Sequence, residues 1–176
     1  MKLQKLTQKL LTGLILIWIV SLPSYADDDT LNELFVQLKN VAQEKEARRL
    51  EHMIWKQWFK SGDAAIDELM ETAMEKRRWY DFNGALEILN QIIELKPDYS
   101  EAWNQRATVY FRQQSFEKSL IDIAKTLELE PRHFGAMAGR AVIRLQQNKP
   151  ALARQNIMEA IKFHPYLKER NMFPGL

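Results

Sequence analysis

The fold is decided by residues 100–133, which read SEAWNQRATVYFRQQSFEKSLIDIAKTLELEPRH. In the first half, apolar residues recur at the steps of three and four that mark one helical face: Trp103, Ala107, Tyr110 and Phe111. The second half repeats the pattern with Phe116, Leu120, Ile123 and Leu127. Pro131 follows, where a proline can end a helix without breaking it internally. The stretch therefore predicts a hairpin of two helices.

The same pattern recurs at intervals of 34 residues on both sides of this stretch. The positions that repeat are Pro97, Pro131 and Pro165; Ala73, Ala107 and Ala141; Ala85, Ser119 and Ala153; and Leu89, Ile123 and Ile157. The small residues let the two helices of a hairpin approach closely where they cross. Several coincident series at one period predict stacked helical units. We expect three hairpins, over residues 66–99, 100–133 and 134–167, in an all-α solenoid.

This unit resembles the tetratricopeptide repeat (TPR), whose 34-residue pattern is W-x2-L-G-x2-Y, then A-x3-F, then P. The middle unit matches it with Trp103-x2-Arg106-Ala107-x2-Tyr110, then Ser119-x3-Ile123, then Pro131. The units depart from the pattern by carrying Ala where Gly is common. The resemblance covers residues 66–165. It implies that the first helices of the hairpins line a concave groove that binds a peptide or protein.

Mapped onto this sequence, the resemblance implies a groove lined from all three units: Met70, Met74, Arg77, Arg78, Asn104, Thr108, Phe111, Arg112, Val142 and Leu145. Methionines adapt to varied apolar partners. The three arginines can grip an acidic segment through charge-assisted hydrogen bonds. Alternatively, the run Lys76-Arg-Arg78 is a solvated helix end whose cations complement the helix dipole. The Lys and Asn clamp of chaperone-binding members is not assembled here, since Met70, Met74 and Gln105 replace three of its residues.

Residues 1–26 have the three parts of a secretory signal peptide. Three lysines precede an apolar run over residues 10–20, and the small residues Ser24 and Ala26 flank Tyr25. The apolar run is shorter than the ~20 residues that cross a bilayer as a helix. We therefore expect cleavage after Ala26 and export to the periplasm, or secretion. The alternative is an uncleaved membrane anchor.

Residues 27–63 predict a helical pair that is not a fourth repeat, because Lys39, Glu51 and Trp58 stand where the repeat needs small residues. We expect the pair to cover the exposed apolar end of the solenoid, since terminal units need caps. Trp55 and Trp58 then pack in this cap, or alternatively anchor a partner. Residues 168–176 form a short tail. Either this end folds back over the last hairpin, or it leaves an apolar edge that favours self-association.

The sequence offers no chemistry for catalysis. It has no cysteine, its three histidines lack metal-ligand spacing, and it has no phosphate-binding loop or nucleophile motif. We place His133 and His164 in surface turns beside the unit-ending prolines. Removal of the leader lowers Lys+Arg from 25 to 22 against 23 Asp+Glu, a net charge of −1, which does not favour nucleic-acid binding.

We therefore expect a non-enzymatic scaffold with no catalytic, cofactor or metal site. Its partner is expected to be a protein or peptide, with no nucleic acid, no small-molecule substrate, and membrane contact only if the leader is retained. A self-associating structural subunit of an envelope complex is the alternative.

Overall fold

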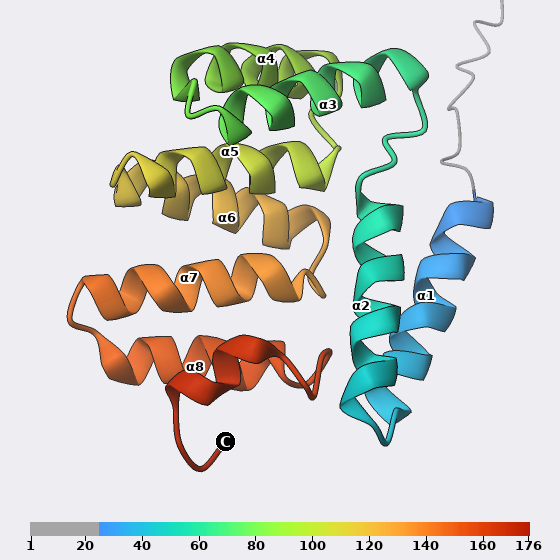
Figure 1. The fold of residues 1–176 in the computed structure, drawn as a ribbon, viewed down its shortest axis with the longest axis vertical. Helices are drawn as coiled ribbons and strands as arrows, with labels where there is room; N and C mark the ends of the chain where they lie inside the picture. Colours follow the sequence, from blue (N-terminus) through green and yellow to red (C-terminus); the bar gives the residue numbers. More distant parts are fainter. Residues whose placement is uncertain (1–24) are drawn as a thin grey trace, which may run out of the picture.

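The computed structural model describes residues 25–176, so residues 1–24 of the predicted signal peptide lie outside the described part. Within it the chain forms eight α-helices and one 3-10 helix, without strands. The α-helices are α1 (Tyr25–Asn40), α2 (Glu44–Trp58), α3 (Ala64–Arg78), α4 (Phe82–Leu95), α5 (Ser100–Arg112), α6 (Phe116–Leu129), α7 (Phe134–Gln146) and α8 (Pro150–Ala160); the 3-10 helix is η1 (Lys168–Met172). The all-α solenoid of three hairpins, preceded by a helical pair, is confirmed (Figure 1).

The three hairpins are α3 with α4, α5 with α6, and α7 with α8, stacked one upon the next (Figure 1). The small residues of the 34-residue pattern lie where the paired helices cross, and each is almost fully buried. At the middle crossing, the hydroxyl of Ser119 donates a hydrogen bond of 2.8 Å to the carbonyl oxygen of Ala107. A larger side chain at either position would hold the helices apart.

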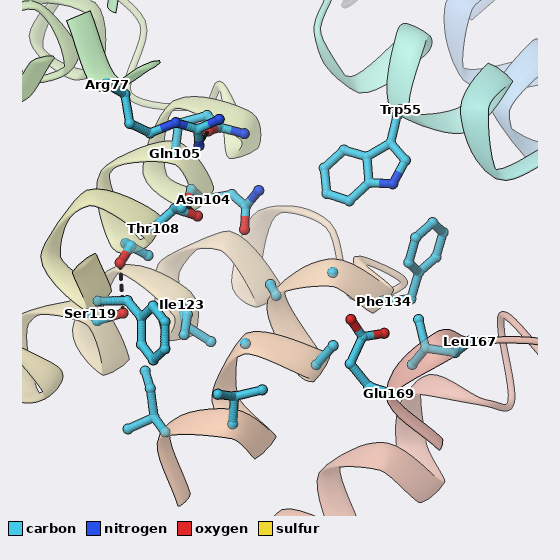
Figure 2. Close-up of a pocket in the computed structure, with 18 of the residues that line it drawn as sticks. Trp55, Arg77, Asn104, Gln105, Thr108, Ser119, Ile123, Phe134, Leu167 and Glu169 are labelled. Carbon is cyan, nitrogen blue, oxygen red and sulfur yellow. Dashed lines mark hydrogen bonds between the residues drawn. The ribbon is translucent and has the colours of Figure 1, made fainter. Parts of the chain in front are cut away.

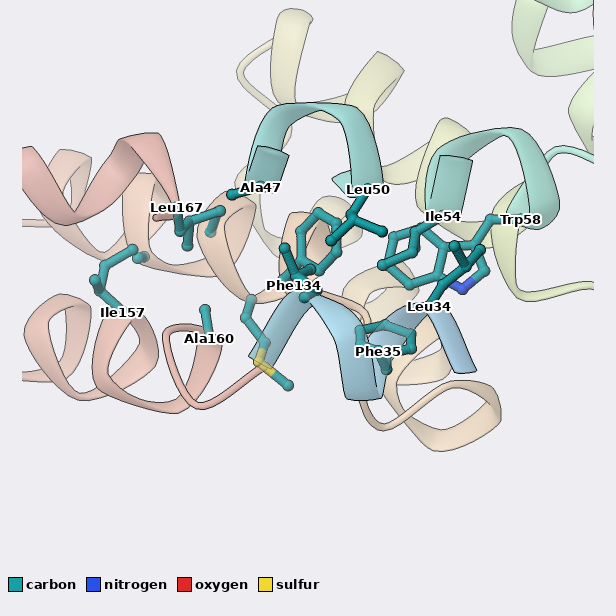
Figure 3. Close-up of a cluster of buried hydrophobic side chains, with 14 of the residues drawn as sticks. Leu34, Phe35, Ala47, Leu50, Ile54, Trp58, Phe134, Ile157, Ala160 and Leu167 are labelled. Carbon is teal, nitrogen blue, oxygen red and sulfur yellow. The ribbon is translucent and has the colours of Figure 1, made fainter. Parts of the chain in front are cut away.

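The amino-terminal pair does not cap the first hairpin. Helices α1 and α2 run alongside the stack, with their apolar faces against the third hairpin (Figures 1 and 3). Gly62, with φ of +82°, lies in the turn between α2 and α3, a backbone conformation that glycine adopts without strain. This turn redirects the chain so that α2 passes along the stack. The expectation of a cap next to the first hairpin is therefore corrected.

The largest buried cluster joins this pair to the third hairpin (Figure 3). Phe35, Leu38, Leu50, Ile54 and Trp58 from α1 and α2 meet α7 and α8 in this cluster. Trp58 is 5% exposed, which places it in the core rather than on a surface open to a partner. Full burial of one such side chain contributes about 1.5–3 kcal/mol, so docking of the pair stabilises the third hairpin substantially.

The carboxy-terminal end folds back over the third hairpin and the pair. Leu167 is 3% exposed and belongs to the large cluster, with Tyr166 and Phe173 packed against it. The phenol of Tyr166 donates a hydrogen bond of 2.8 Å to the carbonyl oxygen of Ala42, which precedes α2. The tail thus covers part of the apolar edge on which the self-association alternative depends.

Ala107→Arg tests the close crossing of the middle hairpin. Ala107 is 2% exposed, so the substitution buries a charge without a partner and should lower the free energy of unfolding by about 3–5 kcal/mol. The control is Gln113→Arg, which adds the same charge at an exposed position of this hairpin. Chemical denaturation monitored by circular dichroism measures both. Equal stability of the two variants would contradict the assignment.

Glu51→Gln tests the contact between α2 and the end of the third hairpin. His164, with its Nε2 3.1 Å from a Glu51 oxygen, and Arg48 hold the pKa of Glu51 below its ordinary value against the opposing effect of burial. The contact between His164 and Glu51 is within the distance of an ion pair, but its angles are not those of a hydrogen bond.

A lowered native pKa stabilises the fold above the unfolded pKa, about 4.3 for glutamate, and this contribution is lost as the pH falls through the native value. Wild type should therefore melt at a higher temperature than Glu51→Gln near neutral pH. The difference should shrink below about pH 4.3. A difference that stays constant across this acid range would contradict the role given to the carboxylate.

Candidate binding groove

The concave side of the stack holds a cavity of about 590 Å³. All three hairpins contribute to its wall, chiefly through α3, α5 and α7 (Figure 2). It is also lined by Trp55 and Phe59, from α2 and the turn after it, and by Leu167 and Glu169, from the carboxy-terminal end. The groove implied by the repeats is therefore partly closed into a cavity by segments outside the repeats.

Six of the ten predicted groove residues line this cavity: Met74, Arg77, Asn104, Thr108, Phe111 and Val142. Arg78 and Arg112 instead line an adjacent recess of about 270 Å³, together with Met74, Arg77 and Tyr80. Met70 is 2% exposed and belongs to the core of the first hairpin. Leu145 is partly buried against the large cluster and lines neither space.

The floor of the cavity offers mostly apolar surface with a few amides and hydroxyls. Val142, Ile143 and Gly139 of α7 contribute the apolar part, and Thr108 and Asn104 of α5 the polar part. This combination is typical of sites that bury apolar groups of a ligand and orient them with few hydrogen bonds. A cavity of this kind can hold side chains of another polypeptide.

A buried polar network lies beside the cavity and centres on Glu101, which is 0% exposed. Its carboxylate accepts hydrogen bonds from the side-chain amides of Asn104 and Gln105, and lies 3.0 Å from Nε2 of His133. The Nδ1 atom of His133 accepts a hydrogen bond from the backbone N–H of Ala136, so the proton is on Nε2 and is donated to Glu101. These donors compensate for burying the charge.

The network extends to the concave surface. Gln105 accepts a hydrogen bond from the guanidinium of Arg77, which holds that side chain at the border of the cavity and the recess. At the other end, the indole of Trp58 stacks on His133 with the ring centroids 4.0 Å apart and the planes 8° from parallel. Side chains of α2, α5 and α3 are thus coupled through a histidine at the start of α7.

Both carboxy-terminal histidines are buried, which corrects the expectation that they lie in surface turns. His133 and His164 are each 0% exposed. The physical reason is the amino-terminal pair, because Trp58 covers His133 and Glu51 approaches His164. Without α2 the two histidines would lie at the margin of the third hairpin, as the repeat pattern alone predicts.

The cations at the end of α3 have different surroundings. Lys76 forms an ion pair of 2.8 Å with Asp81, and Arg77 is bound to Gln105. Among the side chains of residues 29–176, no carboxylate pairs with Arg78 or Arg112. Burial and, next, the charge of Arg112 lower the pKa of Arg77; the buried Glu101 opposes this shift, and Arg78 adds to it. The helix-dipole interpretation suits Lys76, whereas none of the three arginines forms an ion pair with a carboxylate among residues 29–176.

Sequence reasoning missed the residues that close the groove. Trp55, Phe59 and Glu169 lie outside the repeats, and Leu167 is the last residue of the third unit, after its two helices, so the helical pattern of the repeat could not place them. The one available signal was the density of aromatic residues at the end of the amino-terminal segment. No group of three or more acidic or histidine side chains suited to a metal ion occurs among the described side chains of residues 29–176. Helices α1 to α8 include none that is long and apolar enough to span a bilayer.

Comparison with known proteins agrees with the repeat pattern. A TPR repeat-containing protein of Rhizobium etli is 42% identical over 116 residues, which cover 64% of this chain and 55% of that protein. The described helices form a stack of three helical hairpins. This chain is a tetratricopeptide repeat protein. No model of a protein family matches it. The TPR chain spans about half the length of this bacterial relative.

Other similar proteins share the fold at lower identity. The DnaJ protein P58IPK homolog A of Oryza sativa subsp. japonica is 35% identical over 63 residues, 36% of this TPR chain and 13% of that protein. The first TPR of Spaghetti (RPAP3), solved with an HSP90 peptide, superposes with a TM-score of 0.58 at 18% identity, over 61% of this chain and 85% of that one. MamA superposes with a TM-score of 0.53 at 14% identity, over 82% and 81%. The fold is that of a protein–protein interaction module.

Glu101→Ala tests the buried network of this TPR protein. The substitution leaves the donors of His133, Asn104 and Gln105 buried without their acceptor. Each buried donor left unsatisfied costs about 1–3 kcal/mol of folding free energy. We expect a loss of about 3 kcal/mol, which lowers the melting temperature by roughly 6–12 °C. Glu117→Ala, at an exposed position, is the control. If both variants have the melting temperature of wild type, the network does not stabilise the fold.

Proposed function

We propose that this TPR protein is an exported, non-enzymatic adaptor that binds a segment of a partner polypeptide in the cavity on its concave side. The observation that carries the proposal is the cavity itself, to which all three hairpins, α2 and the tail contribute. The apolar part of its floor offers surface that a partner's side chains can bury, and Asn104 and Thr108 offer polar groups for orientation.

The size of the cavity favours an extended segment as its occupant. At about 590 Å³, it falls within the roughly 300–1,000 Å³ of sites that take compact ligands. It therefore suits a few consecutive side chains rather than a whole helix. Trp55 and Glu169 face the space from outside the repeats and narrow it (Figure 2).

Export is supported by the sequence pattern of residues 1–26, and it places the adaptor in the periplasm or outside the cell. We expect the chain recovered from the envelope fraction to begin at Asp27, after removal of the leader. Mass determination of the intact protein from that fraction measures this directly. A mass that includes residues 1–26 would favour the membrane-anchored alternative.

Gly139→Leu tests binding in the cavity. A Cβ atom at Gly139 would meet only Ile123 Cδ1, at 3.7 Å, so a side chain fits there without a clash and extends into the cavity. Gly139→Ala is the matched control, because it adds a methyl group and favours the helix while leaving most of the cavity open. We expect both variants to fold with wild-type helicity.

Crosslinking capture from the envelope fraction provides the measurement. Wild type and Gly139→Ala should recover the same protein, whereas Gly139→Leu should recover at least tenfold less of it. Equal recovery by all three chains would show that the cavity is not the binding site. Recovery of only the TPR protein itself would instead favour the self-associating subunit.

A further inference from the structure

The turns of the three hairpins are built alike but carry different residues. Each contains one residue in the left-handed region at the same repeat position: Tyr80 with φ of 62°, Gln114 with 59° and Asn148 with 56°. Trp79, Gln113 and Gln147 precede them. The fold therefore needs the left-handed backbone at this position, but two of the three hairpins achieve it with polar side chains.

The first hairpin instead exposes two aromatic rings, one of them on a residue with a strained backbone. Trp79 is 75% exposed and Tyr80 is 73% exposed. A bulky residue with positive φ is strained, whereas Asn adopts this conformation more readily. Tyr80 does contact the ring of Phe82, with centroids 5.9 Å apart. The counterpart Phe116 packs on Phe111 instead, beside a turn without aromatic residues, so the fold does not require this contact.

Next to this turn lies the recess of about 270 Å³ in which the arginines gather. Tyr80 forms part of its wall, with Met74, Arg77, Arg78 and Arg112. Three guanidinium groups share a space that contains no carboxylate, and Arg77 is partly buried. Such an arrangement repels itself until an anion enters, and guanidinium groups bind carboxylates with paired hydrogen bonds.

We propose that the tip of the first hairpin binds an acidic segment of a partner polypeptide. The carboxylates of the segment enter the recess between Arg77, Arg78 and Arg112, and its apolar groups pack on Trp79 and Tyr80. Because the recess and the cavity share Met74 and Arg77, a single extended segment can occupy both. Because it assumes a polypeptide partner, the inference rests on the proposed function, and it adds that the bound segment is acidic.

The surroundings of the tip favour a polypeptide over an anionic membrane. The arginines lie in a recess, where a protruding side chain reaches them more easily than a flat surface does. Glu75 and Glu87 are exposed near the recess or its turn, and they would repel a bilayer of anionic lipids. A chain can place its acidic groups between these carboxylates.

The test is selection from a phage-displayed library of random twelve-residue peptides, with the full TPR chain as bait. Wild type should enrich peptides that contain Asp and Glu near an apolar residue. The chosen variants are Trp79→Gln with Tyr80→Asn, which restore the polar turn of the other hairpins, and Arg78→Gln with Arg112→Gln. Arg154→Gln with Lys149→Gln, at exposed positions of the third hairpin, is the control for lost charge.

Fluorescence anisotropy with one selected peptide measures the dissociation constants. Each tip variant should raise the dissociation constant at least tenfold, and the control should raise it less than twofold. Replacement of the peptide's Glu by Gln should also raise it at least tenfold. The Trp79→Gln, Tyr80→Asn variant should melt at or above the temperature of wild type, because the strain at residue 80 is relieved. A structural role for the aromatic residues would instead lower its melting temperature while leaving binding unchanged.

Three outcomes would overturn the inference. They are no acidic enrichment, equal binding by the tip variants, or binding of phosphatidylglycerol vesicles that these variants abolish while no peptide binds. Failure of the proposed function is recognised separately. If Gly139→Leu releases the captured partner and the tip variants do not, the groove function stands without this inference. If only the tip variants release it, the tip of the first hairpin is a binding site and the cavity is not.

Discussion

The stacking of Trp58 on His133 is the contact on which the rest of the architecture depends. It joins the end of α2 to the first residue before α7, with ring centroids 4.0 Å apart. Because His133 also donates to the buried Glu101, the same contact shields from water the charge that orders Asn104 and Gln105. Loss of the stacking would expose the network to water and weaken the docking of the amino-terminal pair on the third hairpin.

This docking changes what a short repeat array can do. Three hairpins alone present an open concave face, whereas here the end of α2 and the turn after it supply Trp55 and Phe59, and the carboxy-terminal end supplies Leu167, as a further wall. The result is a partly closed cavity beside an arginine-lined recess. Through Gln105, the network also holds Arg77 where these two spaces meet. The stability of the amino-terminal pair and the shape of the binding surface are therefore coupled.

The hairpins could be predicted from the sequence because their contacts are local. A helix packs mainly on its neighbours in the chain, so spacing and small residues at the crossings specify the stack. Most of the predicted groove residues lie around the cavity or the recess for the same reason. The position of the pair could not be predicted, since its contacts join distant residues, such as Tyr166 with Ala42. The burial of His133 and His164 follows from that docking and was missed with it.

The central claim is that the amino-terminal pair docks on the third hairpin through Trp58 and His133. The most direct measurement is a nuclear Overhauser spectrum of the chain from Asp27, with the tryptophan and histidine rings assigned. The account predicts cross-peaks between the Trp58 indole and the His133 imidazole, with the imidazole protons shifted upfield by the stacked ring. Cross-peaks from Trp58 to residues of the first hairpin alone, with none to His133, would contradict it.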